Sequence, residues 1–162
     1  MALRRNAIVT GGAGDIGLAI AQKLAADGWR IGLLDLNPRD LDVAASKIAG
    51  ATALVADVTD EVQCSAVVEK FGGADLLVNN AGVASGGRFI DGNYEEWRRI
   101  QATNVDAVWN LSQIFAKRLV AAKLPGAIIN IASIASFRVN GVSTAYAASK
   151  AAVAHLTRSL AL

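Results

Sequence analysis

Cysteine, histidine and proline are scarce in this chain of 162 residues, which contains one Cys, one His and two Pro. A single cysteine excludes an internal disulfide framework, and one Cys with one His do not provide the usual ligands of a zinc site. We therefore expect no bound metal. Cys64 has no histidine near it in the sequence, so a nucleophilic role is not expected. His155 is expected to be structural.

The chain also has no concentrated positive charge. Its formal net charge is +2, and its Lys and Arg residues are scattered without a basic stripe. Nucleic acid and anionic membranes are therefore not expected as partners. No apolar stretch approaches the ~20 residues that span a bilayer, and the first residues lack the pattern of a signal peptide. We expect a cytoplasmic protein.

Short apolar stretches alternate with amphipathic ones along the whole chain. The pattern predicts strands at 6–10, 30–34, 51–56, 75–78 and 127–132, and helices at 18–27, 39–48, 59–71, 94–123 and from 144 onward. Such alternation is typical of parallel strands joined by right-handed crossovers, with helices on both sheet faces. We predict an α/β, doubly wound fold of the Rossmann type, with strand order 3-2-1-4-5.

Polar residues follow the predicted strands. Asp35, Asp57, Asn80 and Ser133 each come at or just after a strand end. In doubly wound sheets, ligands bind beyond the carboxyl ends of the strands, near the point where the strand order reverses. We therefore expect these side chains to surround one site. Asp57 is also a candidate for capping the next helix, and so is Thr59.

A glycine-rich segment follows the first predicted strand. Residues Gly12–Gly17 (GAGDIG) fit the G-x-G-x-x-G pattern between a strand and a helix. Glycines allow the backbone to approach a pyrophosphate, which then lies at the N-terminus of the helix. A purely structural turn and the nucleotide loop of a methyltransferase are the alternatives for this segment.

Asp35 lies eighteen residues after Gly17, at the end of the second predicted strand. A carboxylate there can accept hydrogen bonds from both ribose hydroxyls, and it would repel a 2′-phosphate. We therefore favour NAD over NADP. Arg39 is the one nearby cation that argues otherwise, and a helix cap is the alternative role for Asp35.

Tyr146 lies thirteen residues after Ser133 in a predicted helix, and Lys150 follows Tyr146 by four residues. Residues four apart share a helix face. A free phenol has a pKa of about 10, and an adjacent ammonium favours the phenolate, so Tyr146 can serve as an acid–base group. The Ser133 hydroxyl can hold a substrate carbonyl oxygen. The alternative is an ordinary helix with a half-buried Tyr and a surface Lys.

Together these motifs resemble the short-chain dehydrogenases/reductases, over essentially the whole chain. The matching segments are Thr10–Gly17 (TGGAGDIG), Asp35, Ala56–Val58 (ADV), Asn79–Gly82 (NNAG), Asn104–Val105, Ile129–Ser133 (INIAS) and Tyr146–Lys150 (YAASK). The resemblance gives the methyltransferase alternative no support, because a methyltransferase offers Ser133, Tyr146 and Lys150 no common purpose.

The resemblance implies a role for each matching residue. Tyr146 would be the acid–base, Ser133 the carbonyl-positioning hydroxyl, Lys150 the modulator of Tyr146, and Asn104 the holder of a proton-relaying water. From the sequence alone, Asn104 would be an ordinary polar position or the cause of a bend in its helix. The implied cofactor-binding residues are Gly11, Gly14, Asp15, Ile16, Gly17, Asp35, Asp57, Val58, Asn80, Ala81, Gly82, Tyr146 and Lys150.

The chain departs from the family pattern in two respects. The family usually has glycine at the position of Asp15, which either places a carboxylate near the pyrophosphate or caps the helix. Family members also continue beyond Leu162 with a further strand, a loop over the substrate and more helices. The resemblance thus implies one NAD-binding domain, residues 1–162, truncated at its C-terminal end, with an apolar edge strand at 127–132.

The function that the resemblance implies is hydride transfer between a secondary alcohol or ketone and a nicotinamide cofactor. The expected cofactor is NAD, with NADP less favoured, and the expected substrate is a small molecule. A homo-oligomer is expected, because the family often uses the helices that contain Trp109 and Tyr146 as a subunit interface. The alternative function is a truncated, non-catalytic module that binds a nucleotide or oligomerises.

Overall fold

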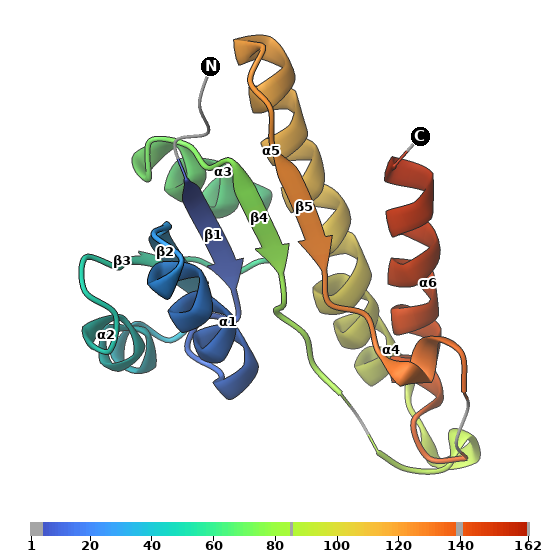
Figure 1. Ribbon diagram of the computed structural model, residues 1–162. Helices are drawn as coiled ribbons and strands as arrows, with labels where there is room; N and C mark the ends of the chain where they lie inside the picture. Colours follow the sequence, from blue (N-terminus) through green and yellow to red (C-terminus); the bar gives the residue numbers. More distant parts are fainter. Residues whose placement is uncertain (1–4, 85, 139–140, 162) are drawn as a thin grey trace.

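A five-stranded parallel sheet forms the centre of the computed structural model, which describes residues 5–84, 86–138 and 141–161 (Figure 1). Its order is β3-β2-β1-β4-β5, and every neighbouring pair is parallel. The strands are β1 (Asn6–Thr10), β2 (Arg30–Asp35), β3 (Thr52–Val55), β4 (Leu76–Asn79) and β5 (Ala127–Asn130). The predicted fold class and strand order are confirmed.

Six α-helices are present in the described part of the chain. They are α1 (Asp15–Ala26), α2 (Pro38–Ser46), α3 (Glu61–Lys70), α4 (Tyr94–Gln101), α5 (Ala107–Ala122) and α6 (Thr144–Leu160). Two short 3-10 helices, η1 (Phe89–Asp91) and η3 (Ile134–Ser136), precede α4 and α6. A π-helical segment, η2 (Ala102–Asp106), joins α4 to α5. The single long helix predicted at 94–123 is therefore interrupted by a π-helical turn.

The sheet buries apolar side chains on both faces, which explains why its strands read as continuous apolar runs. In β1, Ile8 packs in a cluster with Phe71, Leu111 and other residues of the α3 and α5 side. Its neighbour Val9 packs in a second cluster with residues of α1 and α2. Full burial of one such side chain contributes about 1.5 to 3 kcal/mol. The two clusters fix the helices over the strands and so place the strand ends.

The first turn of α3 is capped by Asp60. The Asp60 carboxylate accepts a hydrogen bond from the Gln63 N–H at 3.0 Å. The prediction that Thr59 caps this helix is therefore wrong. Thr59 instead donates its N–H and its hydroxyl to Asp57 Oδ1, at 2.8 Å and 2.7 Å. A carboxylate one residue later is the better cap because it reaches the N3 amide.

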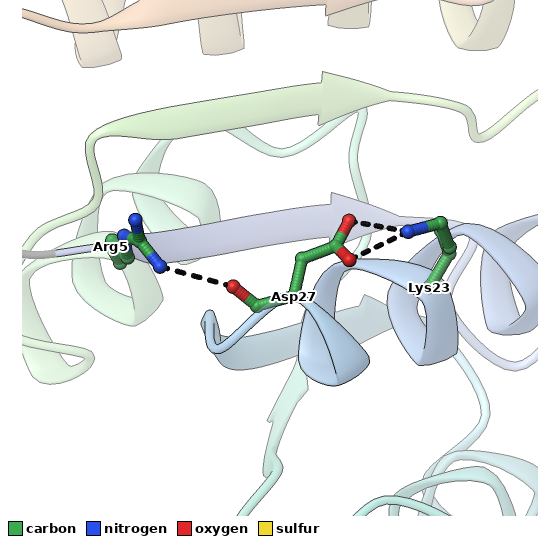
Figure 2. Close-up of polar contacts among 3 residues, drawn as sticks. All are labelled: Arg5, Lys23 and Asp27. Carbon is green, nitrogen blue, oxygen red and sulfur yellow. Dashed lines mark hydrogen bonds and ion pairs between the residues drawn. The ribbon is translucent and has the colours of Figure 1, made fainter.

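A charged contact closes the far end of α1, where the chain turns back toward β2 (Figure 2). Lys23 Nζ lies 2.6 Å from both carboxylate oxygens of Asp27, and Arg5 donates to the Asp27 carbonyl at 3.2 Å. These groups are exposed, and an exposed pair of this spacing contributes only about 0.3 to 0.5 kcal/mol. The contact therefore adds little to the stability of the fold.

Among the described helices, none combines the length and the apolar character needed to cross a membrane.

Candidate functional site

Three glycines shape the loop between β1 and α1. Gly11 has φ of +63°, a conformation that favours glycine. A Cβ on Gly17 would lie 2.1 Å from the Gly11 carbonyl oxygen, so only glycine lets α1 pack against the loop. Gly14 is the N-cap of α1 and supplies no capping side chain. The first N–H groups of α1 are therefore free to receive an anion.

Thr10 and Asn80 hold this loop against the segment that follows β4. The Thr10 hydroxyl accepts hydrogen bonds from the N–H groups of Asn80 and Ala81, at 3.0 Å and 2.9 Å. In return the Asn80 side-chain amide donates to the carbonyls of Thr10 and Gly11, at 2.9 Å and 3.3 Å. Asn80 therefore contributes to the site by shaping the loop. Thr10 was not predicted as a site residue, although it opens the quoted glycine motif.

The Asp35 carboxylate lies at the end of β2 and faces the glycine loop. Its Oδ2 accepts from the Ala13 N–H at 3.0 Å, and its Oδ1 accepts from the Leu36 N–H at 2.8 Å. The helix cap of α2 is Asn37, which accepts from the Arg39 N–H at 3.0 Å. The alternative role of Asp35 as that cap is therefore wrong. Each Asp35 oxygen still has a lone pair free for a ligand.

The predicted cofactor-binding residues on the nucleotide side surround one cleft of about 860 Å³. All eleven of them line it: Gly11, Gly14, Asp15, Ile16, Gly17, Asp35, Asp57, Val58, Asn80, Ala81 and Gly82. Seven further residues complete the lining: Leu36, Ala56, Thr59, Val83, Arg99, Ala102 and Thr103. The glycine motif, the strand ends and the family resemblance together indicated the first set. Arg99, Ala102 and Thr103 come from α4 and η2, where no local sequence pattern indicates a cleft.

Asp15 is the first residue of α1 and exposes its carboxylate at the cleft. The N-cap is Gly14, and no side chain caps the helix. The expectation that Asp15 serves as the cap is therefore wrong. The helix N-terminus stabilises the negative charge of Asp15. The same charge would repel an anion bound at the first turn of α1.

Lys150 is buried in α6, with 5% of its surface exposed. Its Nζ donates to the Ile131 carbonyl, just beyond β5, at 2.7 Å. Burial lowers the pKa of the Lys150 ammonium below its ordinary value of 10.5. The Nζ lies 5.9 Å from the centre of the Tyr146 ring. The alternative of an exposed lysine on an ordinary helix is therefore wrong.

Asn104 is fully buried within the π-helical segment η2. Its Oδ1 accepts from the Val83 N–H at 2.8 Å, and its Nδ2 donates to the Val83 carbonyl and to Ser149 Oγ, both at 2.9 Å. Ser149 in turn donates to the Tyr146 carbonyl at 2.7 Å. Asn104 therefore connects the loop after β4 to the first turn of α6. A bend at this position was one of the two sequence-based interpretations.

Gly82 joins the cleft to the buried lysine. A Cβ added to Gly82 would lie 3.3 Å from Asn104 Oδ1 and 3.5 Å from Lys150 Nζ. Gly82 also lines the nucleotide cleft. The ammonium of Lys150 therefore lies directly behind one wall of that cleft.

Ser133 and Tyr146 lie next to this region, outside the lining of the cleft. Ser133 Oγ accepts from the Ala135 N–H at 3.1 Å, so the hydroxyl hydrogen remains available for donation. Within the described residues, the Tyr146 hydroxyl makes no hydrogen bond to protein. The elements η3 and α6 pack against each other, and within the described residues no hydrogen bond joins the side chains of Ser133 and Tyr146.

Neither Cys64 nor His155 lines the cleft, although the Cys64 thiol donates to the carbonyl of Asp57, which does. Cys64 is buried in α3, and burial, helped by the charges of Asp57 and Asp60, raises the pKa of its thiol to about 11. His155 lies exposed on α6. No group of three or more His, Cys, Asp or Glu side chains in the described ranges is arranged to hold a metal ion.

The site and the fold together define a class of protein. A family profile described as short chain dehydrogenase matches residues 5–162. The chain therefore belongs to the short-chain dehydrogenase family, as its motifs predicted.

Individual relatives in the family are similar to this chain over nearly its whole length. Galactitol 2-dehydrogenase (L-tagatose-forming) of Cereibacter sphaeroides is 38% identical, over 96% of this chain and 63% of the relative. L-2,3-butanediol dehydrogenase of Corynebacterium glutamicum is 37% identical, over 98% of this chain and 66% of the relative. The structure of NAD⁺-bound xylitol dehydrogenase superposes with a TM-score of 0.89 at 31% identity, covering 96% of this chain and 63% of that one. This chain thus spans 63% of the length of two of these proteins.

Proposed function

We propose that the chain is the cofactor-binding and catalytic part of an oxidoreductase that moves a hydride between a secondary alcohol or ketone and NAD. One observation carries the proposal: Gly82 lines a cleft with a glycine loop and a helix N-terminus, and a Cβ on Gly82 would lie 3.5 Å from the buried Lys150 Nζ. The role of each residue below is part of this proposal.

The cleft fits a dinucleotide. The uncapped first turn of α1 would bind the pyrophosphate. Glycine at position 17 lets the loop lie against α1, because a side chain there would collide with the Gly11 carbonyl. The Asp35 carboxylate would accept hydrogen bonds from the adenosine ribose. Since Asp35 would repel a 2′-phosphate, NAD is the proposed cofactor. The similarity to an NAD⁺-bound xylitol dehydrogenase supports the same choice.

Tyr146 and the residues around it would transfer the proton of the substrate hydroxyl. When bound, the dinucleotide supplies the nicotinamide ring that accepts or gives the hydride. Tyr146 would take the hydroxyl proton of the alcohol in one direction and return it in the other. The charged form of Lys150 would stabilise the Tyr146 phenolate. Ser133 would donate its free hydroxyl hydrogen to the substrate oxygen, which fixes the reacting carbon.

The hydrogen bonds of Asn104 limit how it could hold a water. Both of its amide hydrogens are already donated, and its Oδ1 has one lone pair left after the bond from Val83. The side chain can therefore hold a water only through that lone pair. We assign it chiefly to holding Val83 and the first turn of α6 in place, with the relay water as its second role.

The proposed substrate is a small secondary alcohol, and the similar proteins named for galactitol and 2,3-butanediol favour one with neighbouring hydroxyls. We further propose a single domain, a cytoplasmic location and a homo-oligomer.

The function is tested by incubating the purified protein with NAD or NADP and a panel of secondary alcohols. We expect reduced nicotinamide to form with NAD and at least one polyol or diol, and to form more slowly with NADP. Binding of NAD without turnover of any alcohol or ketone would favour the non-catalytic module. Absence of dinucleotide binding would contradict the proposal altogether.

A further inference from the structure

The short 3-10 helix η3 (Ile134–Ser136) follows β5 after three residues, the last of which, Ser133, is its N-cap. The Ser133 hydroxyl accepts from the Ala135 N–H at 3.1 Å. The Ser133 N–H donates to the hydroxyl of Ser136 at 3.4 Å. The two serines therefore hold this turn reciprocally, in a capping-box arrangement.

Ser136 has a second partner outside the turn. Its hydroxyl donates to the main-chain carbonyl of Lys150 in α6 at 2.8 Å. One hydroxyl thus accepts from the backbone of Ser133 and donates to the backbone of Lys150. No capping function requires the second bond, because a cap is complete within its own turn.

Lys150 is consequently attached to the segment around Ser133 at two points. Its Nζ donates to the Ile131 carbonyl, two residues before Ser133, and its carbonyl accepts from Ser136, three residues after Ser133. The residue that would hold the substrate oxygen is thereby placed relative to the helix of Tyr146.

Resting on the proposed function above, we propose that Ser136 is a positioning residue, which sets the Ser133 hydroxyl at the distance from Tyr146 that the reaction requires. It touches neither substrate nor cofactor and acts through Ser133. A misplacement of about 1 Å at a reacting group can reduce the rate by about 100-fold. Loss of the Ser136 hydroxyl therefore reduces turnover much more than it reduces dinucleotide binding.

The test is a double-mutant cycle on the purified protein with the alcohol that it oxidises. Ser136→Ala is expected to lower kcat by about 10- to 100-fold, with the Kd for NAD unchanged. Ser136→Thr, which keeps the hydroxyl, is expected to recover most of the loss. In a Ser133→Ala background, Ser136→Ala is expected to cause no further loss, because the group through which it acts is already absent. Equal losses in both backgrounds, or an unchanged kcat, would overturn the proposal.

Amide hydrogen exchange tests the same inference without activity. In Ser136→Ala the Ser133 and Ala135 amides are expected to exchange faster, while amides of β1 keep the rate of the unaltered protein. Unchanged exchange at Ser133 and Ala135 would also overturn the inference. A protein that turns over no alcohol yet shows this exchange pattern would contradict the proposed function and leave the positioning contact of Ser136 supported.

Discussion

At the scale of single residues, the burial of Lys150 makes the stability of the protein depend on pH. Burial lowers the pKa of this ammonium in the folded state below 10.5, its value in the unfolded chain. Between the two pKa values the unfolded state binds more protons, so the stability of the fold rises with pH there. Below that window the ammonium is charged in both states, and its burial is a cost.

Lys150→Met provides the measurement, because it removes the titrating group and keeps much of the side-chain volume. We expect the melting temperature of the unaltered protein to rise relative to that of Lys150→Met as the pH increases from neutral toward 10.5. Lys23→Met is a matched control, because Lys23 is exposed on α1. A difference between the unaltered protein and Lys150→Met that stays constant over this range would contradict the buried, perturbed lysine.

Asp15 is the residue whose charge should oppose a bound pyrophosphate. Replacing Asp15 with Gly is expected to lower the Kd for NAD by about twofold to fivefold, since a charge near a helix N-terminus is worth about 0.3 to 1 kcal/mol. The gain should shrink at high salt. Asp40→Gly, at an exposed acidic residue in the first turn of α2, is the control. Titration calorimetry decides the matter, and an NAD affinity that weakens in Asp15→Gly would show that the carboxylate helps binding.

At the scale of elements, a chain of side-chain amides and a hydroxyl ties α6 to the sheet. Asn79 donates to Asn130 Oδ1 at 2.8 Å, and Asn130 donates to Thr157 Oγ1 at 2.9 Å. Thr157 lies two helical turns beyond Lys150 and donates to the Val153 carbonyl. The end of α6 that contains Tyr146 and Lys150 is therefore positioned partly by a contact at the other half of the helix.

Thr157→Val keeps the shape of this side chain and removes its hydroxyl. We expect a loss of about 1 to 2 kcal/mol in the free energy of unfolding, because the amide of Asn130 loses its acceptor in a partly buried place. Ser159→Ala removes a hydroxyl that bonds the carbonyl four residues earlier but is exposed. It should cost less than about 0.5 kcal/mol. Equal losses of unfolding free energy in the two variants, measured by urea denaturation, would contradict a stabilising role of the Asn130–Thr157 hydrogen bond.

The strands could be predicted from the sequence, whereas the π-helical turn could not. Strand positions followed from short apolar runs, and β1 has its predicted bounds. The π-helical turn at Asn104 could be anticipated only as a bend. It depends on hydrogen bonds to Val83, a loop residue 21 positions earlier, and a local sequence pattern does not encode such a partner.

At the scale of the whole molecule, the cleft forms because parallel strands bring their carboxyl ends to one edge. Residues at those ends could therefore be placed from the sequence, as Asp35 and Asn80 illustrate. Arg99 and Thr103 could not, because they reach the cleft only through the packing of α4 and η2. Thr10, the last residue of β1, also lies at a strand end, but its hydrogen bond from Ala81, 71 residues away, could not be inferred from the sequence.

Exposed apolar residues on α5 lead to a prediction about assembly. Trp109 and Val120 have 49% and 77% of their surfaces exposed. Exposed large apolar side chains are more common where another surface covers them. We expect light scattering to give a mass above that of one chain, and Trp109→Glu to reduce it. A concentration-independent monomer mass for the unaltered protein would contradict the proposed homo-oligomer.

Our central proposal is that Tyr146 exchanges the proton while the glycine loop and Asp35 hold the dinucleotide. The most direct measurement compares Tyr146→Phe with the unaltered protein in hydride transfer to NAD and in NAD binding. We predict that Tyr146→Phe abolishes turnover and leaves the Kd for NAD within about threefold, because only the acid–base group is lost. Full turnover in Tyr146→Phe would contradict the claim.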